Sequence, residues 1–331
     1  MLQLIIGIAV AAIFVALIAR RVEGGDLLLA IGQANFSLIL LAVCIFLTGY
    51  ACRIARWRSM LLQDNPALRW RDCSGPFMAS IAANNVLPFR AGDALRAFAF
   101  SKSLKVPKSA LLASLLVERL LDLLSLLLAL GICLYLFDLD ETVSGNLVNL
   151  GAFGIIGLGL VVMLLLLFPR IFQPPTQLAI RLAAKVAPGL AERLLDFTDR
   201  LFATLRQLAH GPRMAALIAW SALVWGLEGA VFWVIAFGVP GMIVPVAGWL
   251  ALPVSTLATL LPSTPGYVGT FDFFAIAAVE AMGNPTIAAT AYALIVHLVL
   301  WLPPTLIGGA FFLFWIAKRK RNSQIESTES S

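Results

Sequence analysis

The sequence predicts an all-α polytopic membrane protein with about six full spans, two broken, re-entrant helical hairpins and an inverted repeat. The 331 residues are 60% hydrophobic and only 13% charged. Several apolar runs approach or exceed the ~20 residues that an α-helix needs to cross a bilayer. A soluble domain of this composition would expose far too much apolar surface.

The full spans follow the longest apolar runs, and the first of them resembles a secretory signal. No positive charge precedes that run, however, and Arg20 and Arg21 follow it directly, so we expect an uncleaved helix. Two weaker apolar regions, 73–104 and 243–283, are interrupted by Pro and Gly, and each is long enough for two half-helices. The six predicted full spans are 2–19, 34–52, 107–136, 147–168, 213–238 and 286–316.

The positions of Lys and Arg predict the orientation of these spans, because cytoplasmic loops are enriched in both. We place four clusters of positive residues in the cytoplasm, and together they hold 19 of the 24 Lys and Arg residues. They lie after residue 52, before the third span, between 170 and 213, and at 318–321. Both termini are then cytoplasmic. We expect a multi-pass protein of the cytoplasmic (inner) membrane of a bacterium.

The segment 176–209 has a different pattern, with leucines and a phenylalanine recurring every three or four residues and charges between them. This pattern predicts an amphipathic helix, which either lies on the cytoplasmic leaflet or packs on the protein's own cytoplasmic face. Residues 318–331 are rich in charged residues and Ser, so we expect a disordered cytoplasmic tail. Residues 1–317 then form a single transmembrane domain.

The two interrupted regions resemble each other in sequence. "LPFRAGD" (87–93) and "LPSTPGYVGTFD" (261–272) both begin with Leu-Pro and continue with Gly and an acidic residue. The halves, about 1–136 and 147–317, each read as span, span, broken segment, span. Three full spans per half would insert the second half upside down, and paired interrupted segments in inverted halves point to a transporter site near the midplane. The alternative is two unrelated interfacial loops.

Charged residues also occur within the third span, where Glu118, Arg119 and Asp122 lie within two helical turns. A charge at the bilayer centre costs at least ~2.5–3.5 kcal/mol on insertion scales, so such residues face a partner or a cavity. One interpretation is that they neutralise each other between helices. The other is a binding site, since Arg90, Arg96 and Arg119 carry planar guanidinium groups that can each donate two parallel hydrogen bonds to a phosphate.

Other site types lack sequence support. The four cysteines show no metal-ligand spacing, the two histidines lie far apart, and we find no nucleotide-binding glycine motif. We therefore expect no cofactor, no metal and no nucleic-acid partner. His297 in the last span is a candidate for titration near neutral pH.

Three motifs in order carry a family resemblance: "N-x-x-L-P-x-R-A-G-D-x-x-R-A" from Asn84 or Asn85, "SLLVERLLD", and "LPSxPGxxGxFD". Over nearly the whole chain the sequence resembles the lysylphosphatidylglycerol synthase transmembrane-region family of flippase-like integral membrane proteins. That family includes the flippase part of bacterial aminoacyl-phosphatidylglycerol synthases. It also includes stand-alone proteins linked to lipid, polyprenyl-linked glycan and hopanoid pathways.

The resemblance implies a functional core, to which we add four neighbouring polar residues as substrate-binding candidates. Tyr267, Asp272 and His297 depart from the residues common in the family, where glycine, glutamate and arginine are frequent. No segment of the size of the aminoacyl-transferase domain follows residue 317, so we expect a stand-alone member without lysyl transfer. The core comprises Arg90, Asp93, Arg96, Glu118, Arg119, Asp122, Pro265, Gly266 and Gly269, and the added residues are Asn84, Asn85, Asp272 and His297.

These observations favour a non-enzymatic protein that translocates an anionic lipid, or a lipid-linked polyprenyl precursor, across the cytoplasmic membrane. One alternative is a scaffold that recruits a biosynthetic partner protein of a lipid, hopanoid or glycan pathway. Another is a membrane-embedded lipid-modifying enzyme, which would need a nucleophile or metal cluster that the sequence does not offer clearly. Homo-oligomerisation is open.

Overall fold

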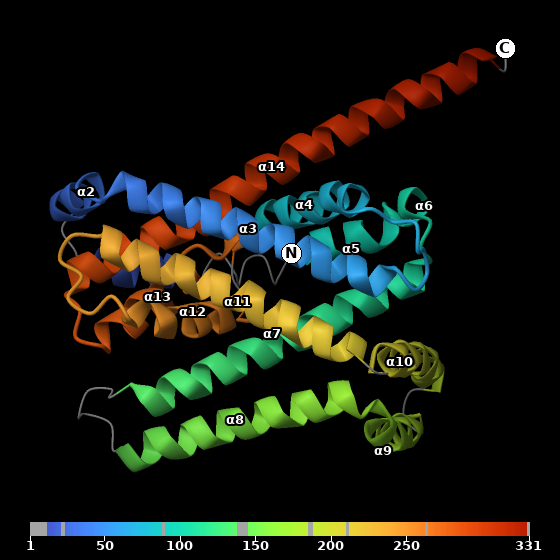
Figure 1. The fold of residues 1–331 in the computed structure, drawn as a ribbon, viewed down its shortest axis with the longest axis horizontal. Helices are drawn as coiled ribbons and strands as arrows, with labels where there is room; N and C mark the ends of the chain where they lie inside the picture. The colour runs from blue at the N-terminus through green and yellow to red at the C-terminus, as the bar shows by residue number, and fades with distance from the viewer. Residues whose placement is uncertain are drawn as a thin grey trace.

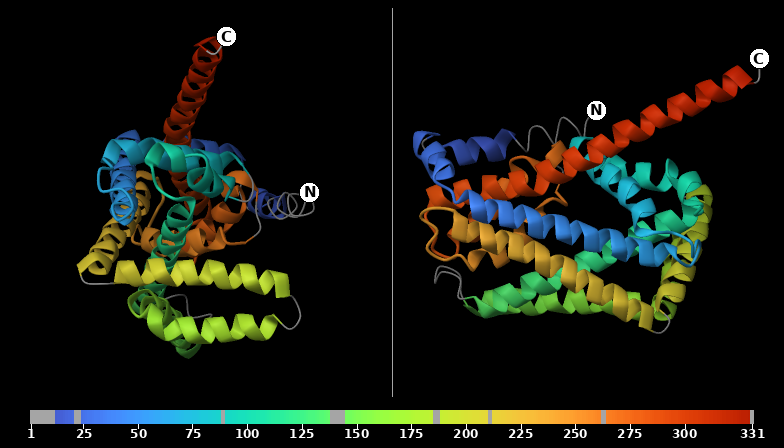
Figure 2. Two further views of the ribbon diagram at one scale, coloured as in Figure 1. Left: turned by 90° about the vertical axis from the view of Figure 1, so that its right-hand side faces the viewer. Right: turned by 45° about the horizontal axis from the view of Figure 1, so that its top comes forward.

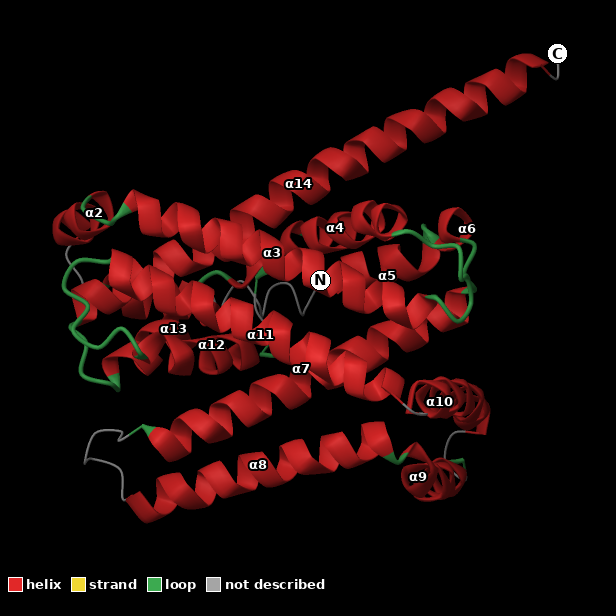
Figure 3. Ribbon diagram, in the orientation of Figure 1, coloured by secondary structure: helices red, strands yellow, loops and turns green. Residues whose placement is uncertain are grey.

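The computed structural model describes residues 12–20, 24–87, 90–137, 145–184, 188–209, 212–261 and 264–329. Within this part of the chain the regular elements are helices, and no strand occurs (Figure 3). The predicted all-α class is therefore confirmed. Most of the predicted first span, and the prolines at 88 and 262, lie outside the described residues.

The labelled helices follow one another in the order shown in Figure 1. Their bounds are α2 (Gly24–Gly32), α3 (Phe36–Leu61), α4 (Trp70–Val86), α5 (Ala91–Phe98), α6 (Ser101–Leu104), α7 (Lys108–Leu136), α8 (Gly145–Leu167), α9 (Pro169–Ala183), α10 (Pro188–Ala209), α11 (Pro212–Gly238), α12 (Ala247–Ala258), the short 3₁₀ helix η2 (Pro265–Tyr267), α13 (Thr270–Glu280) and α14 (Thr286–Glu329).

Four of these helices are long and apolar enough to cross a membrane: α3, α7, α11 and the 286–317 part of α14. A fifth candidate exists if α8 and α9 are counted as one span with a bend of 98°. The chain is thus a multi-pass membrane protein by the length and composition of its helices. The number of six spans stays a prediction.

The helices pack as a bundle in which α3 lies against α11, α4 against α14, and α7 against α8 (Figures 1 and 2). Close helix contact needs small residues where backbones meet. Gly308 of α14 is one of them, since a Cβ atom there would lie 2.0 Å from the carbonyl oxygen of Met78 on α4. Gly92 of α5 is another, with the carbonyl oxygen of Ser80 at 1.9 Å from such an atom.

Both predicted interrupted regions contain a helix break. In the first region, α4 ends at Val86 and α5 begins at Ala91, and the two helices pack against each other. In the second, α12 and α13 pack together and η2 lies between them in sequence. Even α4, with 17 residues, is only about 25 Å long, which is shorter than the ~30 Å hydrocarbon core. Both regions therefore consist of short helices, whereas the inverted repeat that would relate them stays a prediction.

The amphipathic region forms two antiparallel helices, α9 and α10, that cross the end of the bundle (Figure 2, left). Phe202 and Leu205 of α10 are buried, and they pack in one cluster with residues of α7 such as Val117 and Leu121. This contact favours the second of the two interpretations, in which the apolar face packs on the protein itself. The helical region also begins earlier than residue 176, at Pro169.

The C-terminal tail differs from its prediction. The composition of 318–331 predicts disorder, but α14 continues as helix to Glu329 and projects from the bundle (Figure 1). Extending a helix that already exists needs no new nucleation step, which explains how a polar sequence of this kind continues the preceding span.

Candidate functional site: a charged cavity between the helix breaks

A cavity of about 380 Å³ lies where the two interrupted regions meet, and it also contacts α3, α7, α11 and α14. Most of its wall is apolar or aromatic, but charged side chains and one histidine enter it from several elements. These are Arg53, Arg90, Arg119, Asp122, Glu228 and His297.

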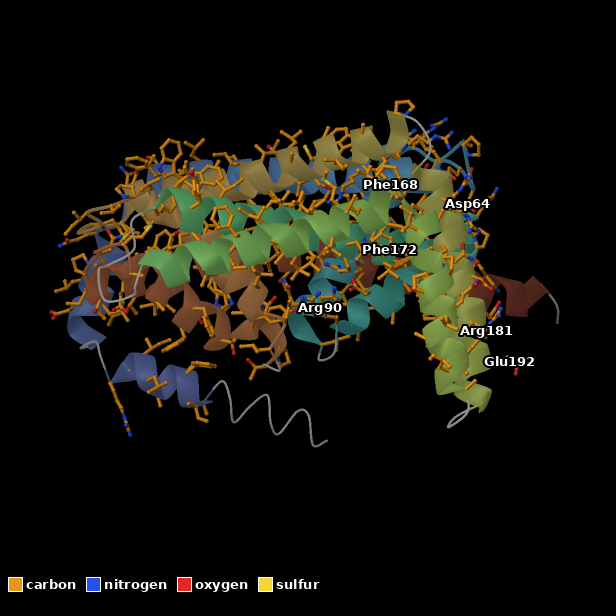
Figure 4. The ribbon with its side chains drawn as sticks, turned by 90° about the horizontal axis from the view of Figure 1, so that it is seen from below. Asp64, Arg90, Phe168, Phe172, Arg181 and Glu192 are labelled. Atoms are coloured by element: carbon orange, nitrogen blue, oxygen red, sulfur yellow. The ribbon has the colours of Figure 1, made fainter. Side chains whose placement is uncertain are left out.

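Arg90 joins the two breaks. It directly precedes α5, and its Nε donates a hydrogen bond to the hydroxyl of Tyr267 in η2 at 3.1 Å. The guanidinium carbon also lies 5.9 Å from the centre of the Tyr267 ring. In Figure 4 the label of Arg90 marks a position between the teal helices of the first region and the orange helices of the second.

Both partners of this contact adopt a left-handed backbone conformation, with φ of 50° at Arg90 and 61° at Tyr267. This region is uncommon for residues other than glycine and costs on the order of 1–3 kcal/mol. Strain of this kind persists only where the surroundings enforce it, and it gathers at functional sites. The outliers here mark the point where the two breaks meet.

Arg90 differs from the other cavity arginines in its charge balance. Arg119 pairs with Asp93 at 3.3 Å, and Arg53 pairs with Glu228. Among the described residues no carboxylate forms an ion pair with Arg90. Arg90 is therefore the cavity cation whose charge an incoming anion can balance.

Arg96 and Glu118 form a buried ion pair outside the cavity wall. Two guanidinium nitrogens of Arg96 donate to the two carboxylate oxygens of Glu118 at 3.1 and 3.2 Å. Arg96 is fully buried between the rings of Trp57 and Phe77, at 5.0 and 4.6 Å from their centres. This pair ties α5 to α7 as neutralising charges between helices, one of the two interpretations that the sequence left open.

Asp93 lies outside the cavity wall and forms hydrogen bonds with two residues that line it, Asn84 and Arg119. One of its oxygens accepts a hydrogen bond from the Asn84 side chain at 3.0 Å, while Arg119 donates to both oxygens at 3.3 Å. Asn85 anchors the end of α4 to α14, because its side chain donates to Thr305 at 2.8 Å. The first break is thus fixed to α7 and α14 by polar contacts.

The second break depends on glycine. Gly266 has a φ of 74° and Gly269 a φ of 84°, values in the left-handed region that glycine adopts at little steric cost. Gly269 donates its N–H to Asp272 Oδ2 at 2.9 Å, at the start of α13. His297 of α14 contacts Asp272 Oδ1 at 2.7 Å through Nδ1 and the Gly266 carbonyl at 2.8 Å through Nε2.

The sequence interpretation missed a layer of arginines on α3. It ended the second span at residue 52 and counted Arg53 and Arg56 as cytoplasmic, but α3 continues to Leu61. Arg56 is buried and donates to Asp122 at 2.8 Å and to Ser221 at 2.7 Å. The sequence did hold a signal for these arginines, because the carboxylates at membrane depth outnumber the arginines placed there and each buried carboxylate needs a cationic partner.

The predicted site residues divide between the cavity wall and the layer behind it. Those that line the cavity are Asn84, Asn85, Arg90, Arg119, Asp122, Gly266 and His297. Those outside its wall are Asp93, Arg96, Glu118, Pro265, Gly269 and Asp272. Across the described residues, no group of three or more His, Cys, Asp or Glu side chains is arranged to hold a metal ion.

Fold and cavity define a class of protein, a helical membrane protein with a charged cavity between two helix breaks. The chain belongs to the lysylphosphatidylglycerol synthase transmembrane-region family, whose model matches residues 4–308. The resemblance seen in the three motifs is thereby confirmed.

A curated relative is the protein named Glycosyltransferase AglD of Haloferax volcanii. The two sequences are 24% identical over 92% of this chain, and the match spans 53% of the relative, so the chain corresponds to about half of that protein's length. The relative's name contradicts the expectation of a protein without enzymatic activity. That expectation considered only nucleophiles and metal clusters, although transfer to a lipid phosphate can use carboxylates and arginines alone.

Proposed function

We propose that the cavity binds the anionic headgroup of a membrane lipid or lipid-linked glycan precursor, and that the chain moves this headgroup across the membrane. The observation that carries the proposal is Arg90, a cavity arginine that forms no ion pair with a carboxylate among the described residues and that is held between the two helix breaks. The family match and the name of the relative support a lipid-linked substrate.

The site suits a phosphate or similar anion. An arginine presents several N–H donors in one plane and binds phosphate oxygens two at a time. The helix α5 begins directly after Arg90, so the positive end of its dipole lies at the same place. The apolar part of the cavity wall can accept the glycerol or prenyl portion of a lipid, whose chains remain in the bilayer.

Movement of the headgroup is supported by the way the cavity is built. Each break contributes residues, and the hydrogen bond between Arg90 and Tyr267 links one to the other. Non-helical backbone at membrane depth occurs where it is buried in protein or lines a polar cavity. Paired interrupted helices of this kind are typical of transporter sites near the midplane.

Reconstitution into vesicles tests this proposal. Fluorescently labelled phosphatidylglycerol in the inner leaflet becomes accessible to an outside quencher only when it is translocated. We expect translocation by the wild-type protein, loss of at least 90% of the rate in Arg90→Ala, and an unchanged rate in Arg181→Ala, whose side chain is exposed on α9. Equal rates in all three proteins would remove Arg90 from the site.

A second candidate, transfer of a sugar to a lipid phosphate, is favoured by the name of the relative. Asp122 is the carboxylate of α7 that lines the cavity and is the candidate base, with Arg56 donating to its Oδ1 and Arg119 Nη1 3.7 Å from its Oδ2. Incubation of the purified protein with a polyprenyl phosphate and a radiolabelled nucleotide sugar tests this activity. Labelled lipid that the wild-type protein forms and the Asp122→Asn variant does not form would establish this transfer activity.

A further inference from the structure

The ring of His297 has two polar contacts that together fix its protonation. Its Nε2 lies 2.8 Å from the carbonyl oxygen of Gly266, and its Nδ1 lies 2.7 Å from Oδ1 of Asp272. A carbonyl oxygen can only accept a hydrogen bond, so Nε2 carries a proton. A ring with no second proton would then point the lone pair of Nδ1 at a carboxylate oxygen, which is repulsive.

The second proton belongs on the ring rather than on Asp272. The other oxygen of that carboxylate accepts the N–H of Gly269 at 2.9 Å, and Asp272 lies in the first turn of α13, where the helix dipole favours a negative charge. A distance of 2.7 Å is also typical of a charge-assisted contact between N⁺–H and O⁻. The geometry therefore corresponds to an imidazolium beside a carboxylate.

We propose that Asp272 and His297 form a proton-binding site that is coupled to anion binding in the cavity. The site itself stands on the contacts above, whereas its coupling to a moving headgroup rests on the proposed function. Each headgroup then crosses the membrane together with a proton, and a pH gradient is able to drive it.

The residues around Asp272 and His297 connect proton binding on the imidazole to anion binding in the cavity. His297 lines the same cavity as Arg90, and its partner Gly266 directly precedes Tyr267, which Arg90 contacts. An anion in the cavity stabilises the positive ring, so by linkage the bound proton strengthens anion binding by the same factor. Loss of the proton from Nδ1 makes the contact with Asp272 repulsive, while Nε2 keeps its hydrogen bond to the Gly266 carbonyl, so the ring and the turn it holds shift away from Asp272.

Other charged and titratable groups face the cavity from several elements, but Asp272 is the described residue that pairs with His297. The helix α12 carries no charged residue, and the ring of Phe271 lies 5.1 Å from the imidazole. The remaining groups are Tyr267 on η2, Arg90 before α5, Tyr50 and Arg53 on α3, Arg119 and Asp122 on α7, and Glu228 on α11.

The proton site is tested by ¹⁵N NMR of the histidine ring, without any transport assay. The chain has two histidines, so His210→Gln leaves His297 as the only signal. We expect both ring nitrogens to be protonated at pH 7, and Nδ1 to lose its proton when Asp272→Asn is added. A neutral ring in the parent protein, or an imidazolium that persists without Asp272, would overturn the site.

The coupling is tested in vesicles with labelled phosphatidylglycerol and an imposed pH gradient. With one proton per headgroup, a gradient of one pH unit supports up to about a tenfold ratio of the labelled lipid between leaflets. His297→Arg keeps a positive charge that cannot leave, so we expect its translocation rate to be the same with and without the gradient, while His210→Gln responds normally. A full response in His297→Arg would overturn the coupling. If the wild-type protein moves no lipid, the proposed function and the coupling fail together, and the proton site is judged by its spectrum alone.

Discussion

The Nε atom of Arg90 lies 3.1 Å from the hydroxyl of Tyr267, although 177 residues separate them in sequence. Each residue follows a helix break, and each has a left-handed backbone. The contact therefore connects two segments that are short, irregular and inserted between long helices. It also leaves the remaining N–H groups of the guanidinium available to a ligand in the cavity.

Removing the hydroxyl of Tyr267 should weaken substrate binding without abolishing it. A neutral hydrogen bond contributes about 1 kcal/mol, which corresponds to roughly a fivefold loss of affinity for the labelled lipid in Tyr267→Phe. Tyr135→Phe, on the exposed end of α7, is the matched control and should bind normally. An unchanged affinity in Tyr267→Phe would show that this contact does not position Arg90.

A methyl group at Gly266 should impair translocation. The residue has a φ of 74°, and a Cβ atom would lie 3.0 Å from the indole nitrogen of Trp301, so both backbone and packing oppose it. We expect at least a tenfold lower rate in Gly266→Ala. Gly157→Ala on α8 is the control, since nothing lies within 4 Å of the added atom there, and equal rates in the two variants would contradict the role of the turn.

Breaking the buried pair of Arg96 and Glu118 should reduce stability. Removing one partner of a buried ion pair costs on the order of 3–5 kcal/mol, and here Asp93, 3.6 Å from Arg96, offsets part of that cost. We expect a clearly lower thermal midpoint in detergent for Glu118→Ala, and substantial recovery when Arg96→Met is added. Glu192→Ala, on the exposed side of α10, should melt like the wild type. A Glu118→Ala protein of normal stability that no longer binds lipid would instead place the pair in the site.

The orientation can be checked by labelling single cysteines with a membrane-impermeant reagent in a cysteine-free background. The distribution of positive residues predicts that the loop containing Asp140 faces outwards and that α9 faces the cytoplasm. Asp140→Cys should react in intact cells, while Arg181→Cys should react only after the membrane is opened. The reverse pattern would invert the topology.

Sequence patterns located most of the helices and both breaks, because long apolar runs and Pro/Gly interruptions are local signals. They ended α3 too early, although it continues to Leu61 and its Arg53 and Arg56 form ion pairs with carboxylates of α11 and α7. They also grouped Arg96 with Arg90, although one is fully buried against Glu118 and the other lines the cavity. Which arginine is paired depends on contacts between distant helices, and no local pattern encodes that.

Native mass spectrometry of the purified protein tests the central claim most directly, because it reports whether an anionic lipid is held through Arg90. We expect the wild-type protein to retain a phosphate-bearing anionic lipid, which Arg90→Ala loses and Arg181→Ala keeps. Retention of the same lipid by Arg90→Ala, or retention of zwitterionic lipid alone by the wild type, would show that Arg90 does not hold an anionic headgroup.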